Sequence, residues 1–153
     1  MSIVRRFFVI QALMLWQGGF LFYAVVVVPT GTEVLGSFAQ GRVTRHVTES
    51  MNLIGVVTLA ILAWDQLQGP RTCRKSRWFL WTFFALSLAV LFWLHHQVER
   101  HVDFAADGRI VDYPAFYFWH RVYLYVITAQ WTIGLVYVAI MLRAWNAAKS
   151  TPP

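Results

Sequence analysis

The residues with the most versatile chemistry in this sequence are histidines and a nearby carboxylate. The candidate metal ligands are His96 and His120, then His95, His46 and Glu49. Imidazoles on separate helices can ligate copper or zinc with a carboxylate as a further ligand, and a pair of them can bind haem iron from two sides. Because histidine titrates near neutral pH, the same group could also sense pH outside the cell.

The same histidines also suit the solvated end of a membrane helix. Three of them fall in WLHHQVERHVD, residues 93–103, which closes a long apolar run. Cationic side chains near a helix C-terminus complement the helix dipole, and histidine is well accommodated among lipid headgroups. The spacing matches no HExxH or comparable metal motif. We therefore favour the helix-end interpretation and keep a ligand role as the alternative.

The composition indicates which solvent surrounds the elements that carry these residues. Of the 153 residues, 58% are hydrophobic and 13% are charged, against roughly 25% charged in ordinary soluble domains. The mean hydropathy is +0.52. A chain of this length forms one domain, residues 1–153, and we expect it to lie in a lipid bilayer. Cys73 is the only cysteine, which excludes an intramolecular disulfide and a cysteine-based zinc site.

Four apolar stretches each approach the roughly 20 helical residues that cross a bilayer. The predicted helices cover residues 4–28, 43–68, 76–101 and 113–147. Pro29 should end the first helix, Gly69 the second, and Asp112 or Tyr113 should cap the fourth. With short links, the expected fold is an all-α membrane protein of four transmembrane helices in an up-down-up-down antiparallel bundle.

The basic residues predict the orientation of this bundle. Although the net charge is +6, the basic residues flank apolar segments, so we expect them to orient the chain and not to bind nucleic acid. One side holds Arg5, Arg6, Arg71, Arg74, Lys75, Arg77, Arg143 and Lys149, and the other holds Arg42, Arg45, Arg100, Arg109 and Arg121. The bias predicts cytoplasmic N and C termini and a multi-pass protein of the bacterial inner (plasma) membrane. Asp65, beside the dense RTCRKSR segment, is expected to form a salt bridge there.

Small and hydrogen-bonding residues predict which helix faces meet, because burying more leucine gains little in lipid. Two such seams recur at steps of three and four: Arg45, Thr48, Asn52, Gly55, Leu59, Leu62 and Gln66 in the second helix, and Phe116, His120, Tyr123, Ile127, Gln130, Gly134 and Tyr137 in the fourth. The first helix offers Gln11, Met14, Gly18, Leu21 and Val25, and the third offers Ser87. Gln11, Asn52 and Gln130 are expected to hydrogen-bond between helices, at about 0.6 kcal/mol each. A polar translocation path is the less favoured alternative.

Three segments carry a resemblance to a known family. GGFLFYAVVVVPTG, VTRHVTESMNLIG and FYFWHRVYLYV resemble the small four-span DUF4149 proteins, which are related to TMEM205-like membrane proteins. The resemblance includes the Phe-x-x-x-His of Phe116 and His120 at the head of the last span, and it implies an integral membrane protein. A fainter likeness to membrane domains of copper-resistance D type proteins would favour metal binding.

No motif in the sequence indicates catalysis, since GxSxG, P-loop and GxGxxG patterns are all missing. We therefore expect a protein without catalytic activity that acts as an auxiliary or scaffolding subunit. Its expected partners are the lipid bilayer and a larger membrane complex or further copies of itself. The alternative is copper, zinc or haem binding by the histidine cluster at the outer face.

Overall fold

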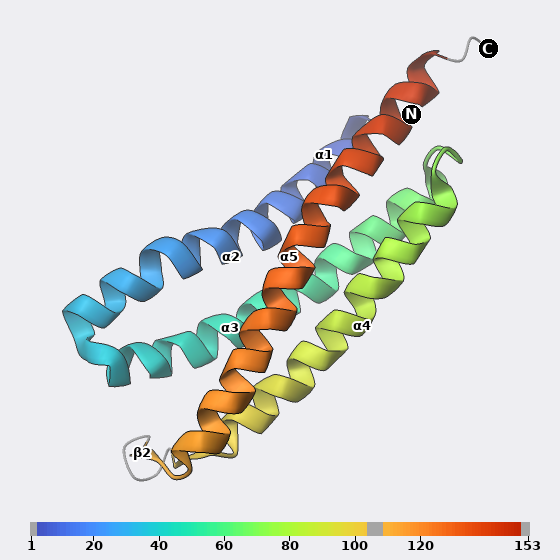
Figure 1. The fold of residues 1–153 in the computed structure, drawn as a ribbon. Coiled ribbons are helices and arrows are strands. Elements are labelled where there is room, and N and C mark those ends of the chain that lie inside the picture. Colours follow the sequence, from blue (N-terminus) through green and yellow to red (C-terminus); the bar gives the residue numbers. More distant parts are fainter. Residues whose placement is uncertain (1–2, 104–108, 151–153) are drawn as a thin grey trace.

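Helices make up almost all of the chain (Figure 1). The computed structural model describes residues 3–103 and 109–150, except for the side chains of Arg109, Lys149 and Ser150. The elements in order are α1 (Ile3–Leu13), the π-helical turn η1 (Met14–Gly18), α2 (Gly19–Phe22), a second π-helical turn η2 (Tyr23–Val27), α3 (Val28–Gln68), α4 (Arg74–Glu99), β1 (Val102–Asp103), β2 (Arg109–Ile110) and α5 (Tyr113–Ser150).

The first helical segment, Ile3–Gln68, turns back on itself at Gly36. This residue has φ 79° and ψ 156°, a conformation that glycine adopts without the steric cost of a side chain. The segment therefore has a first arm, residues 3–35, and a second arm, residues 37–68, which lie side by side in Figure 1. The Tyr23 hydroxyl donates to Thr44 Oγ1 at 2.8 Å, and Gln40 Nε2 donates to the Tyr23 hydroxyl at 3.3 Å. These bonds join the two arms near the turn.

The predicted count of four separate helices is wrong. Among the described residues, three helical segments are long and apolar enough to cross a membrane: Ile3–Gln68, Arg74–Glu99 and Tyr113–Ala148. The predicted break after Pro29 does not occur: the chain runs without interruption from the π-helical turn η2 into α3, and Pro29 lies in the first turn of α3. Helix continues through most of the region in which the sequence predicted a loop.

The remaining helix boundaries agree closely with the sequence. Helices predicted at 76–101 and 113–147 are found at Arg74–Glu99 and Tyr113–Ser150. The backbone N–H of Ala115 donates to Asp112 Oδ1 at 3.1 Å, which confirms the predicted cap. Between α4 and α5, β1 and β2 pair antiparallel in a short hairpin within the predicted polar loop.

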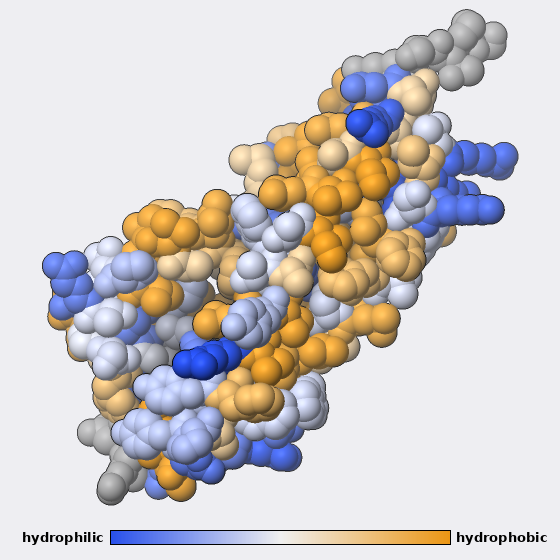
Figure 2. Space-filling view, viewed as in Figure 1, coloured by the Kyte–Doolittle hydropathy of each residue, from blue (hydrophilic) through white to orange (hydrophobic). Residues whose placement is uncertain are grey.

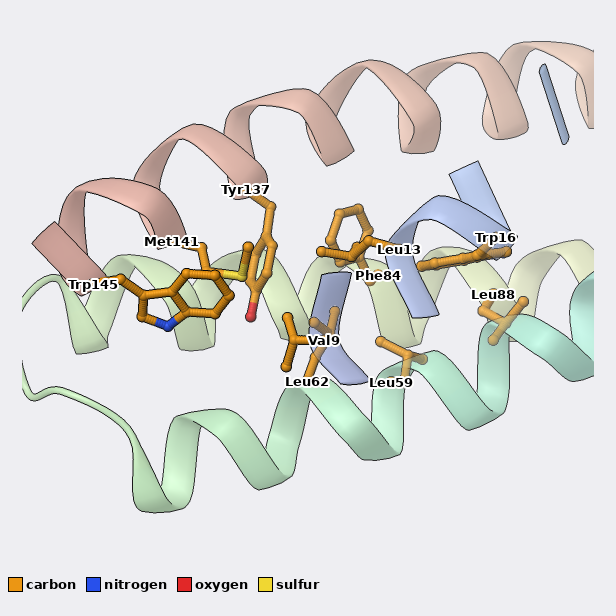
Figure 3. Close-up of a cluster of buried hydrophobic side chains, with 10 residues drawn as sticks. All are labelled: Val9, Leu13, Trp16, Leu59, Leu62, Phe84, Leu88, Tyr137, Met141 and Trp145. Atoms are coloured by element: carbon orange, nitrogen blue, oxygen red, sulfur yellow. The ribbon is translucent and has the colours of Figure 1, made fainter. Parts of the chain in front are cut away.

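The packing places apolar side chains on the outside as well as in the core. Figure 2 shows apolar surface along the helices and hydrophilic atoms gathered mostly toward the two ends. Inside, Phe84 packs against Trp16 and Tyr137, with ring centroids 5.8 and 5.7 Å apart. The buried core of Figure 3 comprises Val9, Leu13, Trp16, Leu59, Leu62, Phe84, Leu88, Tyr137, Met141 and Trp145. Such an arrangement is compatible with a protein whose solvent is lipid.

The elements give the molecule two distinct ends (Figure 1). The start of α1, the turn between α3 and α4, and the end of α5 lie at one end, which we call the terminal end. The turn at Gly36 and the β1–β2 hairpin lie toward the opposite end, which we call the hairpin end. The candidate sites described below fall at these two ends and in a polar layer between them.

Candidate functional site

A buried group of three charged side chains lies at the terminal end. Arg5 Nε lies 2.9 Å from Asp65 Oδ1 in an ion pair, and Arg77 Nη2 donates a hydrogen bond to Asp65 Oδ2. The side chains of Asp65 and Arg77 are 0% exposed, and that of Arg5 is 6% exposed. Arg5 Nη1 also donates to the backbone carbonyl of Gln68 at 2.8 Å. We call Arg5, Asp65 and Arg77 the charge cluster.

Local structure brings the three charges together. Arg5 lies in the first turn of α1, Asp65 in the last turn of α3 and Arg77 in the first turn of α4. The turn between α3 and α4 is tight: a Cβ at Gly69 would collide with the Asp65 carbonyl, and Cys73 adopts a left-handed conformation with φ 55°. This short connection places Arg77 opposite Asp65.

The three buried charges of the cluster are tolerated in the fold only while they are paired with one another. Two guanidinium groups face one carboxylate, so the cluster has one positive charge in excess within a buried site. Removing charges from water is costly unless each is paired, and the two oxygens of Asp65 serve one arginine each. Tyr137 is fully buried beside Arg77. The cluster therefore joins the first arm, α3 and α4 through a single carboxylate.

The sequence indicated only part of this cluster. The predicted salt bridge of Asp65 is confirmed, with Arg77 and Arg5 as its partners. The two arginines had been counted only as basic flanks that orient the chain. The available signal was Asp65 itself, an acidic residue at the end of an apolar helix and twelve positions before an arginine across a turn.

A polar layer crosses the middle of the structure. Gln130 Nε2 of α5 donates to Ser87 Oγ of α4 at 2.8 Å, and Trp131 Nε1 donates to the carbonyl of Gln17 at 3.3 Å. A cavity of about 20 Å³ lies beside these groups, lined in part by Gln17, Asn52 and Gln130. That volume holds about one water molecule. These hydrogen bonds link α5 to α4 and to the first arm, and Asn52 of α3 lines the cavity beside them.

Two of the three predicted hydrogen-bonding seam residues face inward, and the third does not. Asn52 and Gln130 are each 3% exposed, as expected for inward-facing residues. Gln11 is exposed, so the prediction that it faces inward is wrong, and Gln17 contributes to the polar layer in its place. Two of the three seam glycines allow close approach, since a Cβ at Gly134 would collide with the side chain of Gln17 and one at Gly55 with that of Trp16, whereas Gly18 has open space around it.

The predicted histidine ligands lie toward the hairpin end but do not converge. His46, Glu49 and His96 are exposed. His95 Nε2 lies 3.3 Å from Glu99 Oε1 on the same face of α4, and His120 stacks on Phe116 with centroids 5.8 Å apart. Within residues 3–103 and 109–150, no three His, Cys, Asp or Glu side chains gather in a geometry that could hold a metal ion. Copper, zinc or haem binding stays a prediction without geometric support.

Glu99, a carboxylate toward the hairpin end, forms an ion pair between two helices. Glu99 of α4 accepts from Arg45 Nε of α3, so it engages both Arg45 and His95. The pair is partly exposed, with side chains 37% and 22% accessible, so it contributes little to stability. The pair places Arg45 of the second arm level with the end of α4.

Comparisons with known proteins add no relatives. No protein-family model, curated protein or solved structure matches this chain. The resemblance to DUF4149 and TMEM205-like proteins therefore stays a prediction from the three short segments.

Proposed function

We propose that this chain is a multi-pass protein of the bacterial inner membrane that acts as an auxiliary or scaffolding subunit without catalytic activity. It crosses the bilayer four times, with both termini in the cytoplasm. The observation that supports this proposal is the distribution of polarity. The charge cluster and most of the polar layer are enclosed between the helices, while many large apolar side chains lie on the outside.

The lengths of the helices support four crossings. Each arm of the first segment has more than 30 residues and so extends about 45 Å, against a hydrocarbon thickness of about 30 Å. α4 has 26 residues and spans about 39 Å. Both arms of the first segment are therefore long enough to cross, which would carry the turn at Gly36 to the outer side.

The native cysteine tests this topology directly. Cys73 is exposed in the turn between α3 and α4, and it is the only cysteine of the chain. In spheroplasts, a membrane-impermeant maleimide should label Cys73 only after the membrane is opened. In the variant Cys73→Ser/Ser37→Cys, the exposed position beside Gly36 should be labelled from outside. Labelling of both positions from the same side would refute the four-crossing topology.

The outward apolar faces support the scaffolding role. Leu86 of α4 and Tyr125 of α5 are 64% and 73% exposed, and neither packs in the core. Lipid alone can cover such residues, whereas a subunit of an assembly also contacts protein. A photo-crosslinking amino acid at Leu86 or Tyr125 should give a discrete heavier adduct in cells, and the same substitution at buried Tyr137 should not. If neither exposed position yields a protein adduct, the scaffolding role is refuted and the membrane topology is unaffected.

A further inference from the structure

A shallow groove lies between α4 and α5 near the terminal end. Its volume is about 430 Å³. The lining residues are Lys75, Ser76, Phe79, Leu80, Val136 and Ile140. On each helix they follow at intervals of four, which places them on one face. The groove therefore runs along the helices and opens to the outside of the bundle.

The two parts of the groove differ in polarity. Lys75 and Ser76 lie at the start of α4 and are exposed, so the groove is polar where it meets the terminal end. Farther along, its walls are Phe79, Val136 and Leu80, and the Phe79 side chain is 73% exposed. A ligand that satisfies both parts needs an anionic group joined to an extended apolar chain.

Charge complementarity identifies the head of this ligand. Lys75 forms no ion pair with an acidic residue in the part of the chain that the structure describes, and Arg71 and Arg74 lie within four residues of it. Arg77, the other cation of this turn, is occupied by Asp65. Unpaired basic side chains at a membrane surface attract anionic lipid headgroups.

We propose that this groove binds one anionic phospholipid, with the phosphate at Lys75 and Ser76 and an acyl chain along Phe79, Leu80, Val136 and Ile140. The inference rests on the proposed membrane location of the chain. An acyl chain in the groove covers apolar surface that the α4–α5 pair leaves open, and the headgroup supplies the negative charge missing from the terminal end. The site is therefore selective for phosphatidylglycerol over phosphatidylcholine.

Native mass spectrometry of the full chain in detergent, with dioleoyl phosphatidylglycerol or phosphatidylcholine added, tests the proposal. One phosphatidylglycerol should remain bound at concentrations that leave phosphatidylcholine unbound. Lys75→Gln should weaken retention about fivefold, the effect of about 1 kcal/mol for one basic side chain. Val136→Trp should remove retention by filling the groove, and Phe79→Ala should weaken it by removing a wall. Arg143→Gln, an exposed arginine of α5 outside the groove, is the matched control and should retain the lipid.

The other outcomes each refute the proposal in a specific way. Equal losses in Lys75→Gln and Arg143→Gln would indicate unspecific attraction to the basic end. Retention unchanged in both Val136→Trp and Phe79→Ala would show that no acyl chain occupies the groove. Inorganic phosphate that displaces the lipid completely would identify a simple anion site. Carbonate extraction separates these results from the premise, because a chain released from membranes would refute the membrane location itself.

Discussion

Replacing Asp65 by asparagine should destabilise the protein more than any other single loss of a carboxylate. Asparagine keeps the shape of the side chain but removes the charge that both Arg5 and Arg77 require. Breaking a buried ion pair by removing one partner costs about 3–5 kcal/mol, because the remaining charge is left uncompensated. The full figure applies here, since Asp65 and Arg77 are 0% exposed and two cations lose their counter-ion together.

Unfolding of the purified protein in detergent micelles, followed by tryptophan fluorescence during titration with a denaturing detergent, measures this loss. Glu49→Gln is the matched control, because Glu49 is exposed and its substitution should change the free energy of unfolding by less than about 0.5 kcal/mol. The triple variant Arg5→Met/Asp65→Leu/Arg77→Met removes every charge of the cluster. It should recover most of the stability, since buried ion pairs are often replaced by apolar residues without loss. A loss of under about 1 kcal/mol in Asp65→Asn, or a triple variant weaker than the single one, would refute the reasoning.

Three further predictions test other features of the fold and the site. Gly134→Ala should destabilise the protein by about 1–3 kcal/mol in the same assay, because the added Cβ collides with Gln17, whereas Gly18→Ala, with open space around it, should not. Gly36→Ala should cost about 1–3 kcal/mol because φ 79° with ψ 156° lies in a region that almost only glycine adopts, and an unchanged stability would place the turn elsewhere. Metal analysis and the visible spectrum should show no stoichiometric copper, zinc or haem; a bound metal that is lost in His96→Ala would restore the metal interpretation.

The sequence predicted the inner faces of the helices that follow a regular period and mispredicted the inner face of the first arm, which does not. The seams from Asn52 and Gln130 were found because side chains at steps of three and four share a helix face, and the second arm and α5 are regular α-helices. In the first arm, Gln11 was taken to mark the inner face, but the pairing of Arg5 directs residues such as Val9 and Trp16 inward. The π-helical turns η1 and η2 then change the number of residues per turn, which a fixed period cannot follow.

The turn and the charge cluster depend on information that local patterns do not contain. Pro29 predicted the end of a helix and a loop after it, yet only Gly36 leaves the helical conformation within Val28–Gln68. Arg5 and Asp65 are sixty positions apart, and nothing local distinguishes an arginine that pairs inside the bundle from one that meets headgroups. The histidines show the opposite. Three of them lie close together in sequence, yet in the part of the chain that the structure describes they form no group that could hold a metal ion.

The order in which the chain emerges during synthesis gives the charge cluster a consequence for assembly. In the proposed topology, Arg5 and Asp65 can neutralise each other once residues 3–68 have left the ribosome, so the first hairpin would enter the lipid with this pair already neutral. The second oxygen of Asp65 stays unoccupied until Arg77 follows, twelve residues later. The guanidinium of Arg77 would then dock onto a preformed pair and hold the start of α4 at the proposed cytoplasmic side.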